Sequence, residues 1–148
     1  MLIAPRRFQC QTWAAGGAPA YCYRFNTRPN GASAELGVTH FQEVAFVFDN
    51  TNGYGYDVYP NPFGGMPESY FSLAKLISSS WASFIHDLDP NSFRLHDTTT
   101  PPWPVYDNAD PQDFVWDANV TELAYSEPDT YRAEGIAAIL SLNRVLHR

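Results

Sequence analysis

Hydrophobic residues follow a strand pattern in two places along the chain. Residues 21–25, YCYRF, alternate aromatic with other side chains, which is typical of a strand with one buried face. Residues 44–48, VAFVF, are continuously apolar and end at Asp49 and Asn50, two residues that favour turns. A continuous apolar run of this length predicts a strand buried on both faces.

Two longer stretches follow a helical pattern. Residues 68–86 predict a helix that has Pro67 at its start and that ends before Pro90, which cannot continue it. Residues 129–147 predict a last helix that opens after Pro128. The apolar residues at helical spacing are Leu73, Ile77, Trp81, Phe84 and Ile85 in the first helix and Ile136, Ile139, Leu140 and Leu146 in the second.

The segments between these elements are rich in Gly, Pro and Asn. Residues 50–65 interleave such turn residues with Tyr54, Tyr56, Tyr59 and Phe63. A loop of this kind can line a binding cleft, although aromatic side chains there more often only cover the core. In residues 1–17, Phe8 and Trp13 are expected to act as apolar anchors.

A single histidine, His40, lies in the loop between the two predicted strands. Enzymes of the α/β class often place a general base on a loop beyond a buried strand, because the scaffold holds the loop in place. Composition alone favours the simpler interpretation, a structural loop histidine.

Composition narrows the class of protein. A chain of 148 residues with 45% hydrophobic residues is long enough for one domain with a core. The net charge of −7 argues against nucleic acid as a partner. Acidic residues are concentrated between Asp87 and Glu134, and we interpret them as a solvated acidic face.

Targeting signals are sparse. The sequence has no apolar run long enough to span a bilayer, and its first residues lack the apolar core of a signal peptide. Cys10 and Cys22 could pair in an oxidising compartment, but two buried thiols are an equally good interpretation. Asn119 begins the sequence Asn-Val-Thr, a glycosylation acceptor only if the protein is secreted.

Two apparent motifs fail on inspection. The sequence around Ser33, Gly-Ala-Ser-Ala-Glu, nearly spells a nucleophile elbow, but Glu35 replaces the second glycine and a loop surrounds the serine. The acidic and histidine residues between 86 and 97 have neither the calcium-loop pattern nor the spacing of zinc ligands. We therefore expect neither a serine nucleophile at this position nor a metal.

The residues around His40 carry a more specific signal. Residues 37–43, GVTHFQE, followed directly by VAFVF, resemble the histidine segment of type-B carboxylesterases, the family of fungal lipases and cholinesterases. The family pattern is Gly-x-x-His-x-x-Glu before a hydrophobic strand that ends in Val-Phe. Two later blocks, WASF (81–84) with DPN (89–91) and WPVY (103–106), resemble the family in the same order.

This resemblance implies an α/β fold. Residues 1–148 would be the C-terminal portion of a single α/β-hydrolase domain, with the last sheet strands, the catalytic-histidine loop and the C-terminal helices. Such a portion is incomplete on its own. The strand at 21–25 would have an open edge, and the isolated chain would be marginally stable or prone to aggregation.

The resemblance also implies the chemistry. His40 would be the base of a Ser-His-Glu/Asp triad in a hydrolase of carboxylic esters, a carboxylesterase or lipase. In the family the serine, the acid and the oxyanion loop lie upstream of the histidine, so the isolated chain is expected to be inactive. Glu43 would be a supporting carboxylate rather than the triad acid. Phe41 replaces the family's usual small residue and would alter the pocket wall beside the base.

The implied partners are an ester or lipid substrate and the N-terminal part of the same domain, without a cofactor. The parent would be extracellular, which agrees with the acceptor sequence at Asn119. An alternative stays open, in which the chain belongs to a non-catalytic, cholinesterase-like binding or adhesion protein. The retained His40 argues mildly against that alternative.

Overall fold

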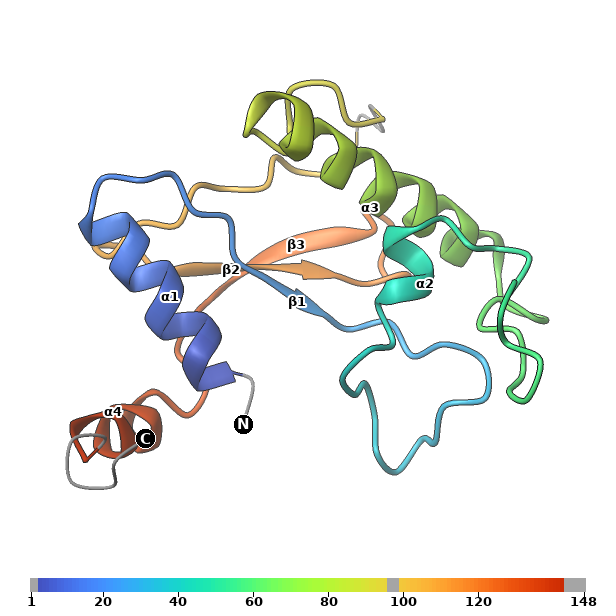
Figure 1. The fold of residues 1–148 in the computed structure, drawn as a ribbon, viewed down its shortest axis with the longest axis horizontal. Helices are drawn as coiled ribbons and strands as arrows, with labels where there is room; N and C mark the ends of the chain where they lie inside the picture. Colours follow the sequence, from blue (N-terminus) through green and yellow to red (C-terminus); the bar gives the residue numbers. More distant parts are fainter. Residues whose placement is uncertain (1–2, 96–98, 143–148) are drawn as a thin grey trace. The chain divides into compact units, whose positions relative to one another are not determined.

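The computed structural model describes residues 3–95 and 99–142. Its elements are the helices α1 (Ile3–Ala15), α2 (Val44–Val47), α3 (Glu68–Asp87) and α4 (Ala133–Ser141) and the strands β1 (Tyr23–Phe25), β2 (Gln112–Trp116) and β3 (Ala124–Pro128). Figure 1 shows this mixture of helices and strands, and it labels each element. No helix in the described ranges is long and apolar enough to cross a membrane.

The three strands form one sheet in the order β1-β2-β3. The N–H of Phe114 donates to the carbonyl of Cys22, and the N–H of Asn26 donates to the carbonyl of Trp116, so β1 and β2 run in the same direction. A turn over residues 117–123 reverses the chain between β2 and β3. The parallel pair and the helices agree with the expected α/β class.

The chain divides into two compact units. One contains residues 1–22, 104–114 and 126–148, and the other contains residues 23–103 and 115–125. We call them the outer-segment unit and the central unit. His40 and its neighbours belong to the central unit.

Aromatic side chains build the core of the central unit. Trp81 of α3 contacts Trp103 and Trp116, with ring centroids 5.4 and 6.4 Å apart. Tyr23 of β1 meets the edges of Trp81 and Trp103. This packing joins α3 to β1 and β2.

Helix α3 confirms the sequence prediction to within one residue. Leu73 and Ile77 are fully buried, whereas Ile85 at the end of the helix is 78% exposed. The helix ends at Leu88, which adopts a left-handed conformation with φ 60° and donates its N–H to the carbonyl of Phe84.

The strand predicted over residues 44–48 is wrong, because this segment contains helix α2. Ala45 and Phe46 are buried, but Phe48 is 76% exposed, so the run is not buried on two faces. A short apolar run fits a buried strand and one turn of buried helix equally well, and periodicity cannot separate them. Helix α2 packs against α3 (Figure 1).

An ion-pair network holds the outer-segment unit together. Both guanidinium groups of Arg6 and Arg7 donate to the carboxylate of Asp129, at distances between N and O of 2.7 to 2.9 Å. Arg6 also pairs with Asp113, and the hydroxyl of Tyr106 donates to Asp129 at 2.9 Å. Phe8 and Trp13, expected as apolar anchors, are instead 54% and 52% exposed.

A disulfide between Cys10 and Cys22 links α1 to the segment that precedes β1. Both residues are buried with Ala20 and Tyr106. Of the two interpretations left open by the sequence, the structure has the paired cysteines.

The last helix is shorter than predicted. Helix α4 covers Ala133–Ser141, within the expected 129–147, and Ile136 is its buried residue. Residues 143–148 lie outside the described ranges. Strands β2 and β3 had no predicted counterpart.

We expect removal of the disulfide to destabilise the chain by about 3 kcal/mol, because the bond closes a short loop and restricts the unfolded chain. Urea unfolding of the oxidised protein and of the Cys10→Ser/Cys22→Ser variant measures this difference. The reduced wild-type protein is the control and should match the double variant. Equal stability of the oxidised protein and the variant would contradict the prediction.

We also expect acid to destabilise the outer-segment unit through Asp129. Burial alone would raise the pKa of Asp129, but hydrogen bonds from Arg7, Arg6 and Tyr106 outweigh burial and hold this pKa at about 2. Because this value lies below the ordinary 3.8, the stabilisation is complete above about pH 4 and is lost as the pH falls through about 2.

Asp129→Asn tests this account. The variant should lose that part of the acid dependence and should be about 3–5 kcal/mol less stable at neutral pH, because the buried Arg7 loses its carboxylate partner and Arg6 keeps only Asp113. The exposed Asp110 gives the matched control, Asp110→Asn. Denaturant titrations from pH 2 to 7 are the measurement, and an unchanged slope in Asp129→Asn would refute the assignment.

Candidate active site

His40 lies in a turn directly before helix α2, and its side chain is exposed. Its ring meets the ring of Phe41 edge to face, with centroids 6.2 Å apart. The turn is closed by local bonds: the N–H of Thr39 donates to the side-chain oxygen of Gln42 at 3.0 Å. The turn thus presents the imidazole to solvent at a fixed point of the chain.

Helix α2 ties this turn to the core through one side chain. Phe46 is fully buried and contacts the rings of Phe25, Phe63 and Tyr70, with centroids 5.0, 4.6 and 6.1 Å away. Burying a phenylalanine contributes about 1.5–3 kcal/mol. His40 is therefore only six residues from an anchor that cannot move without opening the core.

Phe41 adopts an unusual backbone conformation. Its φ is +79°, in the left-handed region that glycine adopts freely and that a residue with a Cβ adopts at a cost. Its ring is 61% exposed. The resemblance to type-B carboxylesterases implied a small residue at this position, and a positive φ is a physical reason to favour one there.

Glu43 is half-buried at the start of α2, where its carbonyl accepts the N–H groups of Phe46 and Val47. Its side chain makes no capping hydrogen bond. Burial, and then the charge of Glu43, raise the pKa of Tyr23 to about 12. The carboxylate thus acts electrostatically toward β1, and no bond between it and His40 occurs in the described part of the chain.

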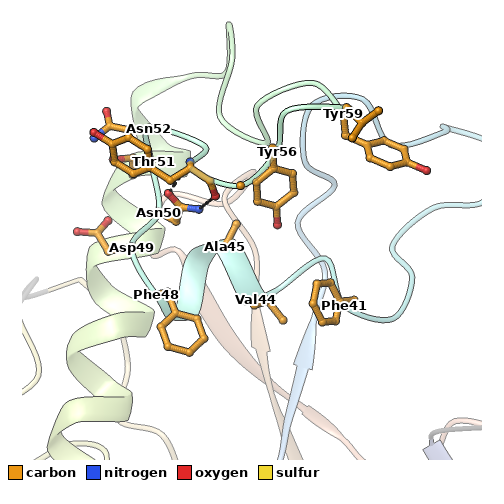
Figure 2. A pocket seen from close by; sticks show the side chains of 13 residues that line it. Phe41, Val44, Ala45, Phe48, Asp49, Asn50, Thr51, Asn52, Tyr56 and Tyr59 are labelled. Atoms are coloured by element: carbon orange, nitrogen blue, oxygen red, sulfur yellow. Dashed lines mark hydrogen bonds between the residues drawn. The ribbon is translucent and has the colours of Figure 1, made fainter.

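A pocket of about 710 Å³ lies beside this turn, between α2 and the tyrosine-rich loop. Figure 2 shows Phe41, Val44 and Phe48 on one side and Tyr56 and Tyr59 on the other. The sequence left open whether the tyrosine-rich loop lines a cleft. Tyr54, Tyr56 and Tyr59 do line this pocket, whereas Phe63 is buried in the core.

Asn50 fixes the start of the tyrosine-rich loop that lines the pocket. Its side-chain nitrogen donates to the carbonyl of Tyr54 at 2.9 Å, and its side-chain oxygen accepts the N–H of Tyr54 at 3.0 Å. Figure 2 marks these hydrogen bonds of Asn50 with dashed lines. A side chain that pairs with the backbone in this way fixes a loop without regular secondary structure.

Chemically, the site has an imidazole close to an apolar wall. Ser33 is an exposed loop serine that accepts the N–H of Glu35, as expected for a position without a nucleophile elbow. Residues 3–95 and 99–142 contain no group of three ligating side chains that could hold a metal. A solvent-facing imidazole beside an apolar pocket can transfer a proton to or from a bound molecule.

The two later motif blocks are joined in the structure. The side-chain nitrogen of Asn91 donates to the carbonyl of Trp103 at 2.9 Å, and the N–H of Trp103 donates to the side-chain oxygen of Asn91 at 2.8 Å. Further along the second block, Tyr106 donates to Asp129. These motif residues therefore support the fold. Asn91 and Trp103 are twelve positions apart, so the sequence alone does not indicate that they pair.

The family model described as "Carboxylesterase family" matches residues 1–131 of the chain. The chain belongs to the carboxylesterase family. Pig (Sus scrofa) liver carboxylesterase is 34% identical over 95 residues, and mouse (Mus musculus) carboxylesterase 5A is 36% identical over 95 residues. Each alignment covers 62% of the chain.

Solved carboxylesterases also match this member of the family in structure. The crystal structure of Geobacillus stearothermophilus carboxylesterase EST55 at pH 6.8 superimposes with a TM-score of 0.63 at 27% identity, over 86% of the chain. The structure at pH 6.2 gives a TM-score of 0.56 at 28% identity, over 83% of the chain. The fold is therefore part of an α/β-hydrolase fold, as the sequence indicated.

The chain spans 14% and 15% of the lengths of these two curated carboxylesterases. The superposition covers 24% of the bacterial carboxylesterase. The family and the partial fold are thus established, and the roles of His40, Glu43 and Phe41 stay predictions.

Phe41→Gly should raise the stability of this carboxylesterase chain by about 1 kcal/mol, because glycine adopts a positive φ without a Cβ clash. Phe41→Ala is the matched control, since it removes the same ring and keeps the Cβ. Urea unfolding should place the glycine variant above the alanine variant. The reverse order would show that the backbone of residue 41 is unstrained.

Proposed function

We propose that His40 is the general base of a serine hydrolase that cleaves carboxylic esters. In this proposal residues 1–148 are the C-terminal portion of one α/β-hydrolase domain. The nucleophilic serine, the triad acid and the oxyanion donors then come from another portion of that domain. The observation that carries the proposal is the exposed His40 beside an apolar pocket, in a segment whose sequence resembles the histidine segment of the family.

His40 is assigned the role of base because a serine hydroxyl needs one to become a strong nucleophile. The hydroxyl is a weak nucleophile until a base accepts its proton, and an imidazole can accept that proton near neutral pH. The same imidazole then returns the proton to the leaving alcohol. An exposed ring on a fixed turn suits both transfers, because the serine and the substrate must reach it from outside these residues.

The surface around the pocket supports a partner of this kind. Phe48, Tyr54, Val58 and Tyr59 lie close together in sequence and are between 76% and 92% exposed. Soluble proteins rarely leave a large apolar patch uncovered. We assign this surface to contact with the remainder of the same domain, because the matched part is only 24% of the bacterial carboxylesterase.

The substrate class rests on the family: an ester, which includes a lipid ester, is the substrate that membership of the carboxylesterase family implies. We also propose that the parent is secreted, since the disulfide between Cys10 and Cys22 is of a kind that persists in oxidising compartments.

The isolated 148-residue chain should neither hydrolyse p-nitrophenyl esters enzymatically nor bind a fluorophosphonate probe covalently at a serine. A longer protein that includes the upstream part of the domain should do both. In that protein His40→Gln should lower kcat by on the order of 10⁵- to 10⁶-fold, because the serine loses its base.

His86→Gln is the matched control, because His86 is an exposed histidine on α3. It should leave kcat unchanged. Probe labelling of the isolated chain, or full activity of the His40→Gln variant, would overturn the proposal. A longer protein without any esterase activity would instead favour the binding-protein alternative.

A further inference from the structure

The turn that joins β2 to β3 combines a fixed backbone with two exposed side chains, Asn119 and Thr121. Asp117 anchors its start: the carboxylate accepts the N–H of Asn119 at 2.9 Å and the side-chain N–H of Asn119 at 2.8 Å. The N–H of Ala118 donates to the buried hydroxyl of Thr27 at 2.8 Å. Leu123 closes the turn, and its own side chain is buried.

We propose that Asn119 carries an N-linked oligosaccharide when the chain passes through the secretory pathway. The acceptor sequence is Asn119-Val120-Thr121, and its middle residue is not proline. Both reactive positions of this sequence are exposed in the folded chain, so an attached sugar extends into solvent and displaces no buried group.

The step balances with one co-reactant, an oligosaccharide linked to a lipid pyrophosphate. A bond forms between the side-chain nitrogen of Asn119 and the anomeric carbon of the first sugar. The bond between that carbon and the pyrophosphate oxygen breaks, and the lipid pyrophosphate leaves with the electron pair. The nitrogen gives up one of its two protons, which passes through solvent to the departing pyrophosphate, and keeps the other.

The remaining proton matters for the turn. Asp117 needs one N–H from the side chain of Asn119, and its second bond in the turn comes from the backbone N–H. The modified nitrogen still has an N–H to donate, and the backbone bond is untouched. The glycan is therefore compatible with the turn that the structure shows.

Other asparagines on exposed or half-buried loops lack the second half of the signal. Asn30 and Asn52 are each followed by glycine, and the residues two positions on are Ala32 and Tyr54. The expected modification is therefore confined to one site, which makes the test simple to read.

The experiment expresses the 148-residue chain behind a secretory leader in yeast and measures mobility before and after treatment with peptide N-glycosidase. Mass spectrometry of the peptide that contains residue 119 then locates the sugar. We expect one glycan, at Asn119. Thr121→Ser keeps the hydroxyl and should keep the glycan, whereas Thr121→Ala should lose it. Asn52→Gln is the control outside the acceptor sequence and should leave the glycan in place.

A secreted chain that contains the intact disulfide and an unmodified Asn119 would overturn the proposal. The same result in both Thr121 variants would do so as well. This test needs no ester hydrolysis, so its outcome is independent of the role proposed for His40.

Discussion

The burial of Phe46 is the constraint on which the candidate site depends. A loop such as 26–43, without regular structure, would not hold a histidine in one place. Helix α2 fixes the end of this loop, because its Phe46 packs in the core among aromatic rings from β1, α3 and the loop that follows α2. The same turn leaves Phe41 and Phe48 outside, so one short helix both anchors the histidine and forms a pocket wall.

The two compact units are stabilised by different physics. The central unit depends on aromatic packing around Trp81, Trp103 and Trp116. The outer-segment unit depends on a buried carboxylate, Asp129, and on a covalent bond between Cys10 and Cys22. Aromatic packing is little affected by pH or by reductants, whereas an ion pair responds to pH and a disulfide responds to reductants.

Sequence reasoning succeeded where the hydrophobic pattern matched the buried face. Helix α3 was predicted almost to the residue, because Leu73 and Ile77 repeat on the side that faces the core. It failed for α1, where the buried residues are Arg7 and Cys10 while Phe8 and Trp13 face outward. No hydrophobicity pattern can reveal a helix that is held by ion pairs and a disulfide. Strand β3, AYSEP, has few apolar residues and takes its place by pairing with the buried β2.

The candidate site divides in the same way. The loop position of His40 could be predicted from the sequence, and its role stays a prediction. The lining role of the tyrosine-rich loop was one of two interpretations that the sequence left open, and the structure has Tyr54, Tyr56 and Tyr59 at the pocket. The helical state of α2 and the positive φ of Phe41 could not be predicted, because each depends on which contacts the folded chain completes. One apolar run supports several local structures, and only the tertiary environment selects among them.

The pairing of Asn91 with Trp103 joins two motif blocks, and the structure constrains the two residues for different physical reasons. The two bonds between the side chain of Asn91 and residue 103 go to the backbone of that residue, so they need the amide of Asn91 and do not involve the indole of Trp103. The indole of Trp103 is held for another reason, its contacts with Trp81 and Trp116. Substitutions at position 103 by another large ring should thus be tolerated independently of position 91. Asn91 and Trp103 can then change independently of each other in evolution.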